Sequence, residues 1–213
     1  MKSVRELRVQ LENAEDPDEF FTVVSDFYRE YGAGIFGVNR AFRISDREDI
    51  LEFEPVKSMD DVVLEDLVGY EVQKQRLLEN TKAFVDGKPA NNVLLYGDKG
   101  TGKSATVKAL LSSFWLEGLR IVEVPLAALT NLPTIFAILR SQPGKFIVFV
   151  DDLAFNDSCP EYTALKTVLE GGLEARPANV VVYATSNRRN IVRQRFSERQ
   201  DDVNERDTLE EKF

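Results

Sequence analysis

The sequence predicts an α/β protein built around one mostly parallel β-sheet. Short apolar runs alternate with helical patterns along residues 63–213, and this alternation is typical of right-handed β-α-β crossovers. The runs at 146–150 and 180–184 are apolar throughout, as expected of strands that are covered on both faces. A glycine-rich turn at 97–104 joins another such run to a helical stretch. These observations favour a three-layer core in which helices cover both faces of the sheet.

Charge and composition narrow the classes of function. The 213 residues include 27 basic and 36 acidic side chains, so the formal net charge is −9, and the hydrophobic content of 43% suffices for a buried core. The negative charge disfavours binding to nucleic acid or anionic membranes, unless a local basic patch overrides it. No apolar run approaches the ~20 residues of a membrane span, and no signal-peptide core follows Met1. We therefore expect a cytoplasmic protein.

Two residue types that often carry chemistry are scarce. There is no histidine, which excludes His-based triads, His general bases and His metal sites. The single cysteine, Cys159, excludes an internal disulfide, and the nearby Asp157 and Glu161 do not favour a thiolate. Any chemistry must therefore rely on carboxylates, lysine, arginine and a bound metal.

Residues 1–40 are predicted to form a small helical segment. A first helix is expected within 3–13, and a second begins at Asp16-Pro17-Asp18-Glu19, which resembles a capped helix start. The second helix carries an aromatic face and ends near Gly32-Ala33-Gly34. We expect this face to pack against the main domain, another subunit or a partner protein, because two short helices cannot bury it alone. Residues 41–62 show no clear period and are predicted to be a connector.

The remaining elements alternate regularly. The patterns predict strands at 93–96, 119–124, 146–150 and 179–184, and helices at about 72–85, 103–116 and 162–169. Residues 126–139, interrupted at Pro133, are predicted to form one or two helical turns. Pro125 ends the second of these strands, and Gly171-Gly172 ends the last helix.

The glycine-rich turn has a pattern that binds phosphate. Its residues, Gly97-Asp98-Lys99-Gly100-Thr101-Gly102-Lys103-Ser104, fit the P-loop pattern G-x-x-x-x-G-K-[ST]. The glycines allow successive backbone N–H groups to point inward at the positive end of a helix. Lys103 would reach the β- and γ-phosphates of a nucleotide, and Ser104 would place its hydroxyl on Mg²⁺. A glycine-rich turn that merely caps a helix is the less favoured alternative, since this pattern arises by chance in roughly one chain in a hundred.

Two strands end in polar residues that suit a bound phosphate. Asp151 and Asp152 follow the strand at 146–150, and Asn187 follows the next strand. Ligands bind beyond the carboxyl ends of parallel strands, so these side chains are expected near the P-loop. Asp151 would hold Mg²⁺, Asp152 would orient the attacking water, and Asn187 would place a neutral amide beside the γ-phosphate. Ordinary strand-end acids and an asparagine turn remain the alternatives.

Together these motifs resemble those of the AAA+ ATPases. Residues 97–104 resemble Walker A, 146–152 resemble Walker B, and Asn187 resembles sensor 1. Asp66-Leu67-Val68-Gly69 resembles the adenine-side motif, which assigns Val68, Gly69 and Tyr70 to the nucleotide. Three further segments resemble an uncharacterised bacterial family of predicted AAA+ ATPases, and this likeness spans about residues 60 to 212. The segments are Tyr183-Ala184-Thr185-Ser186-Asn187-Arg188-Arg189, Pro89-Ala90-Asn91-Asn92-Val93-Leu94-Leu95 and Ala175-Arg176-Pro177.

The resemblance implies a function. It implies binding of ATP and Mg²⁺ and hydrolysis to ADP and phosphate, in a homo-oligomer formed through the AAA+ core. A neighbouring subunit would supply an arginine finger, and the work would be done on a macromolecule. The implied strand order is 5-1-4-3-2. Asp152 stands where many relatives have glutamate, so slower activation of water is expected. We find no fifth strand, finger motif or lid before Phe213, so a C-terminally incomplete core over 63–213 is expected, with an unpaired edge at the P-loop strand.

Other functions stay open at this point. A nucleotide-gated binding module would hold ATP, hydrolyse little and recruit a protein partner through the N-terminal aromatic helices. A small-molecule phosphotransferase ranks third, because residues 153–179 offer no evident acceptor site. A cluster of arginines could include a trans-acting finger or contact a polyanion, but a solvated loop balanced by the following acids is favoured; its members are Arg188, Arg189, Arg193, Arg195 and Arg199.

Overall fold

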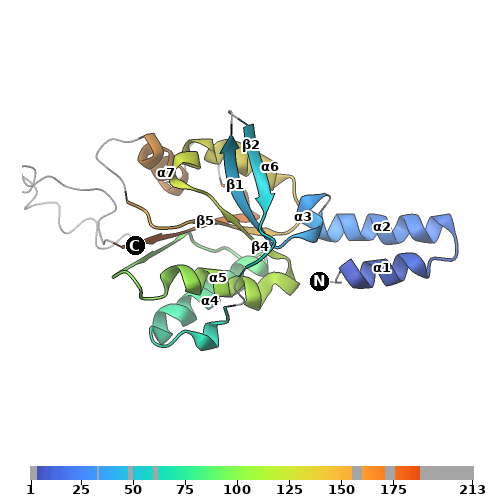
Figure 1. Ribbon diagram of the computed structural model, residues 1–213, viewed down its shortest axis with the longest axis horizontal. Coiled ribbons are helices and arrows are strands. Elements are labelled where there is room, and N and C mark those ends of the chain that lie inside the picture. Colours follow the sequence, from blue (N-terminus) through green and yellow to red (C-terminus); the bar gives the residue numbers. More distant parts are fainter. Residues whose placement is uncertain are drawn as a thin grey trace, which may run out of the picture.

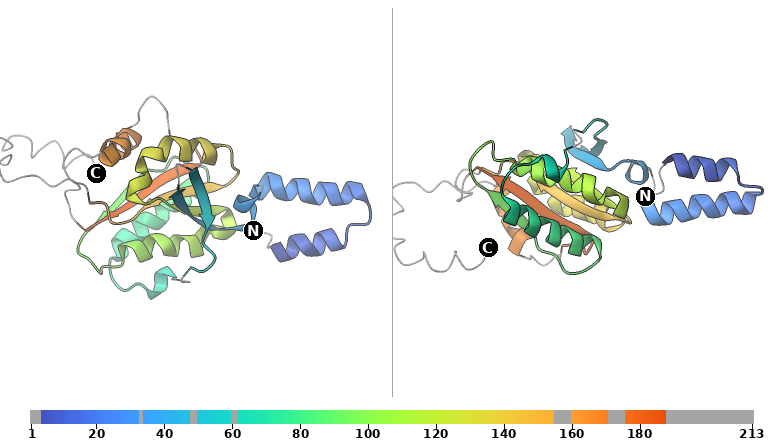
Figure 2. Two further views of the ribbon diagram at one scale, coloured as in Figure 1. Left: turned by 45° about the horizontal axis from the view of Figure 1, so that its top comes forward. Right: turned by 90° about the horizontal axis from the view of Figure 1, so that it is seen from below.

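A six-stranded sheet with helices on both faces forms the core of the described chain (Figure 1). The computed structural model describes residues 4–32, 34–47, 50–59, 62–154, 160–170 and 176–187. Two helices, α1 and α2, project from one end of the core as a hairpin, which Figure 2 shows from two further sides. The predicted α/β class with a mostly parallel sheet is confirmed.

The sheet has the strand order β2-β1-β4-β5-β6-β3. The strands are β1 (Ala41–Arg47), β2 (Ile50–Pro55), β3 (Val93–Tyr96), β4 (Leu119–Glu123), β5 (Lys145–Val150) and β6 (Val180–Ser186). All neighbours pair in parallel except β1 and β2, which pair antiparallel. The four predicted strands follow the expected order, and β3 lies at an edge of the described sheet. A fifth strand, a finger or a lid would fall on residues 188–213, which lie outside the described residues.

The prediction of a connector at 41–62 is wrong for its first half. Strands β1 and β2 form a hairpin that extends the sheet, because β1 pairs in parallel with β4. Phe42 and Ile44 are buried in the core, whereas Arg43 between them is exposed and bonds to Glu123 at 3.1 Å. Phe42 and Ile44 pack on one face of this strand, and on the other face only Ala41 is buried, at the start of the strand. The apolar signal was therefore too short to recognise as a strand.

Seven helices lie within the described residues. They are α1 (Val4–Glu12), α2 (Pro17–Tyr31), α3 (Ile35–Val38), α4 (Glu71–Val85), α5 (Lys103–Phe114), α6 (Leu132–Arg140) and α7 (Pro160–Glu170). Short 3-10 turns occupy Leu64–Asp66, Trp115–Glu117 and Leu126–Asn131, the last of which leads into α6. None of the helices in the described ranges has both the length and the apolar content that crossing a bilayer requires.

The core has two apolar layers, one on each face of the sheet. Alternate residues of β5 serve both: Phe146 and Val148 pack on the side of α6, α7 and the β1–β2 hairpin, and Ile147 and Phe149 pack on the side of α4 and α5. This alternation is the period of a strand, and it explains why β5 is apolar throughout. The three predicted layers are therefore present.

Arg120 fixes the projecting helices to the core. Its side chain is only 2% exposed, and its guanidinium donates to the carbonyl oxygens of Tyr31 and Phe36 at 2.8 Å and of Gly118 at 2.9 Å. Burial lowers the pKa of Arg120 from its ordinary value, but the three carbonyls compensate for lost water. Gly144 leaves room for this group, since a Cβ there would lie 2.6 Å from Nη1 of Arg120.

The start of α2 is capped as the sequence predicts. Asp16 accepts a hydrogen bond from the backbone N–H of Glu19 at 2.8 Å, and Pro17 occupies the first turn. At the other end, Phe27 and Tyr31 are buried, whereas Phe20 and Phe21 are exposed. The aromatic face therefore packs on the core only near the C-terminal end of α2.

We predict that Arg120→Ala lowers the free energy of unfolding by about 3–5 kcal/mol, because three buried carbonyl oxygens lose their charged donor. The matched variant Arg76→Ala removes an exposed guanidinium from α4 and should change stability by about 0.5 kcal/mol or less. Urea unfolding followed by circular dichroism measures both. Equal stabilities of the two variants would contradict the anchoring role of Arg120.

Candidate functional site

The P-loop connects the end of β3 to the start of α5. Gly97, Gly100 and Gly102 have positive φ angles of 148°, 85° and 82°, a region that other residues rarely adopt. Helix α5 begins at Lys103, directly after Gly102, and has no acid in its first turn. The positive end of α5 therefore faces the loop with no acid in its own first turn, which suits an anion site.

Lys103 folds over this loop. Its Nζ donates to the carbonyl oxygens of Gly97 at 2.9 Å and Asp98 at 2.7 Å, and lies 3.4 Å from Oγ1 of Thr101. Thr101 in turn donates to the carbonyl oxygen of Asp98 at 2.9 Å. The ammonium group thus closes the loop into a ring and holds a positive charge at its centre.

The carboxylate of Asp151 joins three elements of the fold. Its Oδ1 accepts hydrogen bonds from Oγ of Ser104, at 2.5 Å, and from Oγ1 of Thr185, at 2.6 Å. Ser104 is the second residue of α5, Asp151 follows β5, and Thr185 lies in β6. The backbone N–H of Asp152 also donates to Oγ1 of Thr185, at 2.8 Å. One buried hydroxyl therefore positions both acids.

Asp152 adopts a strained backbone conformation, with a φ of 55°. The following residue holds it there, because Leu153 donates its N–H to the carbonyl oxygen of Thr185 at 2.7 Å and accepts at its own carbonyl from Oγ of Ser186 at 2.9 Å. The side chain of Asp152 accepts from Nδ2 of Asn187 at 2.5 Å. The strain directs the carboxylate toward the amide at the end of β6.

The predicted residues converge only in part. Lys103, Ser104, Asp151, Asp152 and Asn187 all lie at the carboxyl ends of β3, β5 and β6. The predicted adenine-side residues, Val68, Gly69 and Tyr70, lie before α4. Within the described part of the chain, no hydrogen bond joins them to the P-loop.

The segment that contains these residues nevertheless packs in the apolar layer of α4 and α5, the helix that follows the P-loop. Leu67 packs in the apolar cluster of α4 and α5, and its carbonyl accepts from Nζ of Lys74 at 2.5 Å. Gly69 and Tyr70 have φ angles of 88° and 56°, and Val68 is 96% exposed. The segment is thus a tight turn that presents an apolar side chain to solvent.

Thr185 is a site residue that the sequence analysis did not assign. The parallel register pairs Val150 with Ala184, which places the next residues, Asp151 and Thr185, side by side. A hydroxyl near the carboxyl end of a buried strand, together with acids at the end of the neighbouring strand, was the signal that could have identified it. Thr185 is 1% exposed, so its hydroxyl acts inside the sheet.

We predict that Thr185→Val lowers the free energy of unfolding by about 1–3 kcal/mol, because Asp151 loses a donor and the N–H of Asp152 loses its acceptor. Thr185→Ser keeps the hydroxyl, so it should lower the free energy of unfolding less than Thr185→Val does, although valine is closer to threonine in shape. Urea unfolding of both variants provides the measurement. A valine variant as stable as the wild type would show that these hydrogen bonds do not position the acids.

Comparisons with known proteins give similar solved structures but no curated relative. No curated protein matches the chain. Among solved structures, it is similar to the RuvB Holliday junction branch migration motor of Thermotoga maritima (17% identity, TM-score 0.40, 62% of this chain and 43% of that one). It is also similar to AMPPCP-bound DnaA from Aquifex aeolicus (16% identity, TM-score 0.42, 67% of this chain and 48% of that one). The chain thus spans less than half of either structure.

A family match gives the more direct assignment. It covers residues 38–213, so it begins well before the expected start near residue 60 and includes the β1–β2 hairpin. Helices α1 and α2 lie outside it. With its P-loop core, this chain belongs to the family described as "Protein of unknown function (DUF815)".

Proposed function

We propose that this chain binds Mg-ATP and hydrolyses it to ADP and phosphate. The observation that carries the proposal is the meeting of Ser104 and Asp151, 2.5 Å apart at the base of a P-loop, although 47 residues separate them in sequence. A hydroxyl and a carboxylate at this position are the oxygen donors that a nucleotide-bound magnesium requires. A helix cap alone would need neither Asp151 nor its support by Thr185.

The P-loop would bind the phosphates. Backbone N–H groups of 97–104 and the positive end of α5 attract the anion, and Lys103 supplies a full charge. Nζ of Lys103 donates to the carbonyl oxygens of Gly97 and Asp98, and it would exchange one of its bonds for a β- or γ-phosphate oxygen when a nucleotide binds. Gly97, Asp98, Lys99, Gly100, Thr101 and Gly102 would provide the rest of the cradle.

The residues present fit magnesium. Ser104 and Asp151 offer only oxygen atoms, and Mg²⁺ needs few protein ligands because it keeps several waters. When bound, the ion would neutralise charge on the phosphates. The chain's own contribution is to hold Asp151 in place through Thr185, so that the carboxylate need not reorient.

Asp152 and Asn187 would act on the attacking water. The carboxylate of Asp152 is exposed and would orient the water and accept its proton. The amide of Asn187 donates to Asp152 and could also donate to the water. Aspartate is one methylene shorter than glutamate, so turnover is expected to be slow. Val68, Gly69 and Tyr70 would cover the adenine, for which the exposed Val68 offers an apolar contact.

The protein would work in the cytoplasm as a homo-oligomer, assembled through its AAA+ core and acting on a macromolecular partner. Nucleic acid is a disfavoured partner because of the net charge of −9. A second function, the nucleotide-gated binding module, is favoured by one specific observation: the Nδ2 of Asn187 bonds to Asp152 at 2.5 Å and so occupies the oxygen that would orient water.

We predict that Lys103→Ala and Ser104→Ala each weaken binding of Mg-ATP by at least about tenfold, because each removes a direct ligand of the phosphates or the metal. The matched variant Lys57→Ala removes an exposed lysine outside the motif and should bind as the wild type does. Titration with a fluorescent ATP analogue, with and without Mg²⁺, measures this. The Ser104 variant should lose the magnesium dependence specifically, and unchanged binding in both site variants would refute the site.

We predict that Asp152→Asn keeps nucleotide affinity within a few-fold and reduces phosphate release by about 10²–10⁴-fold, because only the carboxylate can take the proton of water. Steady-state phosphate release at several protein concentrations tests this. If the wild type binds Mg-ATP but releases no phosphate at any protein concentration, the ATPase proposal is wrong and the nucleotide-gated binding module is the better account.

A further inference from the structure

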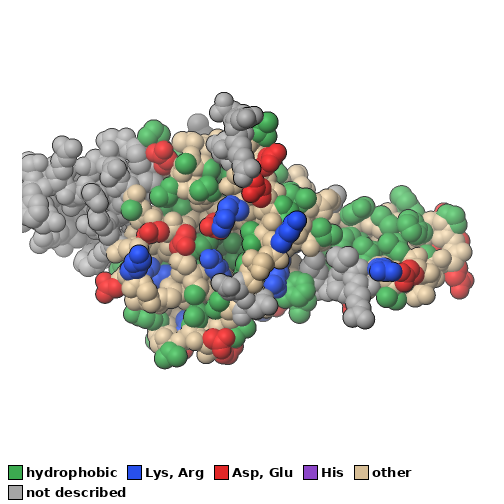
Figure 3. Space-filling view, viewed as in Figure 1, with side chains coloured by type: hydrophobic (Ala, Val, Ile, Leu, Met, Phe, Trp, Pro, Cys, Tyr) green, Lys and Arg blue, Asp and Glu red, His purple; other side chains and the backbone are tan. Residues whose placement is uncertain are grey.

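The hairpin of α1 and α2 carries an acidic and aromatic tip that the core leaves uncovered. Residues 9–28 contain six acids and no lysine or arginine. At the turn, Glu15 and Asp18 are exposed, and Phe20 and Phe21 are 49% and 71% exposed. Figure 3 shows hydrophobic side chains along the hairpin and acids at its far end. We call residues 12–21 the hairpin tip.

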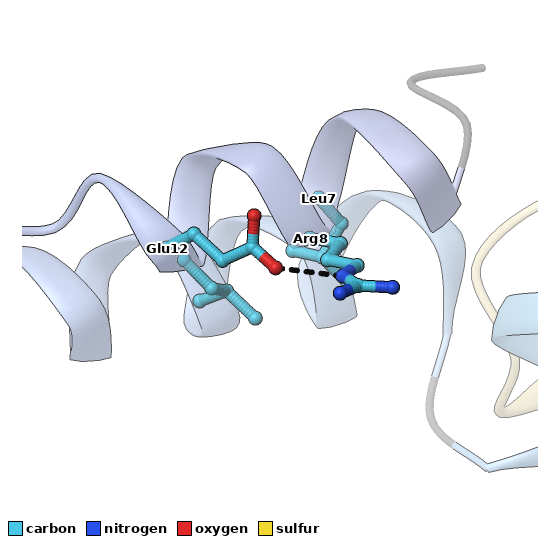
Figure 4. A pocket seen from close by; sticks show the side chains of 4 residues that line it. Leu7, Arg8 and Glu12 are labelled. Atoms are coloured by element: carbon cyan, nitrogen blue, oxygen red, sulfur yellow. Dashed lines mark hydrogen bonds and ion pairs between the residues drawn. The ribbon is translucent and has the colours of Figure 1, made fainter.

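Helix α1 adds a shallow apolar patch next to this tip. Leu7, Arg8, Leu11 and Glu12 line it, and its surface is almost entirely apolar. Figure 4 shows Leu7, Arg8 and Glu12 on α1, with the bond between Arg8 and Glu12 as a dashed line. Arg8 donates through Nε to Glu12 at 2.7 Å, so this cation is paired within its own helix. The hairpin therefore offers a place for an apolar side chain with unbalanced carboxylates close by. Its natural ligand is a segment that is both basic and apolar.

Residues 188–199 of this chain have that chemistry. The sequence Arg-Arg-Asn-Ile-Val-Arg-Gln-Arg-Phe-Ser-Glu-Arg holds five arginines against one acid, together with Ile191, Val192 and Phe196. We propose that the hairpin tip of one copy binds residues 188–199 of a second copy. The arginines would pair with the tip carboxylates, and an apolar side chain such as Phe196 would pack against the exposed Phe20 and Phe21. The proposal does not depend on nucleotide binding.

The geometry requires a second copy. Arg120, the second residue of β4, ties α2 to the amino end of the parallel strands, and the chain leaves β6 at the opposite, carboxyl end beside Gly97. The distance from the carboxyl end of β6 to the hairpin tip is about 40 Å. It is roughly the length of strand β6 plus that of helix α2, which follow one another along the molecule. The stretch from Asn187 to Phe196 reaches at most about 32 Å when fully extended. The tip therefore cannot receive Phe196 of its own chain.

Such a contact joins the head of one molecule to the tail of the next. A head-to-tail contact uses two different surfaces, so each copy can engage two neighbours, and the assembly closes into a ring or grows as a filament. One competitor lies in the same chain: residues 201–211 contain six acids that could pair with the arginines instead. The experiments must separate these two partners of 188–199.

The first experiment measures docking directly. A labelled peptide with the sequence of residues 188–199 is titrated with the full chain, and fluorescence anisotropy is recorded at about 50 and 300 mM NaCl. We expect saturable binding that weakens at high salt. Both Glu15→Arg/Asp18→Arg and Phe21→Ser should weaken it by at least about tenfold. The control Glu52→Arg/Glu65→Arg makes the same charge change on exposed acids elsewhere and should leave binding unchanged. Equal weakening by the control would refute the hairpin as the site.

The second experiment tests assembly by sedimentation velocity. Without nucleotide at low salt, the wild type should associate as its concentration rises, whereas Glu15→Arg/Asp18→Arg and Arg193→Glu/Arg195→Glu should each associate at least about tenfold more weakly. Both variants leave the proposed contact through the AAA+ core unchanged. A chain with all four changes restores opposite charges and should associate again. Circular dichroism checks that each variant keeps its helix content. Association of the tip variant as tight as that of the wild type would overturn the proposal, because the contact through the AAA+ core would then account for all of it. A monomeric wild type that still binds the peptide would also overturn it, since residues 201–211 would then hold the segment.

Discussion

The carboxylate of Asp151 is the interaction on which the site depends. It receives Ser104 from α5 and Thr185 from β6, so it connects the helix after the P-loop to two central strands. A carboxylate withdrawn from water is costly unless several donors satisfy it, and here two hydroxyls do so at once. The same hydroxyl of Thr185 accepts the N–H of Asp152. The positions of both acids and of the P-loop helix are therefore fixed by one small network.

The rest of the fold places this network at one end of the molecule and the projecting helices at the other. Parallel pairing brings the carboxyl ends of β3, β5 and β6 together, which concentrates the polar residues there. Arg120 anchors α2 at the amino end of β4 through three carbonyl oxygens. The polar network and the hairpin tip therefore lie at opposite ends of the parallel strands, with the sheet between them.

The sequence predicted the core well and its periphery poorly, for physical reasons. Residues 97–104 and 146–152 have patterns that only a few structures satisfy, so the P-loop and its acids were recognisable. Strand β1 was missed because it alternates Phe42 and Ile44 with polar residues over too short a length. Thr185 was missed because its role depends on register with β5, which sequence does not reveal. The reach of α2 beyond the core depends on the buried Arg120, which resembles any other charged residue in the sequence.

A crystal structure of this chain with Mg²⁺ and a non-hydrolysable ATP analogue tests the central claim most directly. If the account is correct, the phosphates will lie against the backbone N–H groups of 97–104, Lys103 will contact a terminal phosphate, and the hydroxyl of Ser104 will face the metal beside Asp151. Thr185 will keep its hydrogen bonds to Asp151 and Asp152. Nucleotide bound elsewhere, or a site that stays empty at saturating analogue, would contradict the claim that the Asp151 network is built for Mg-ATP.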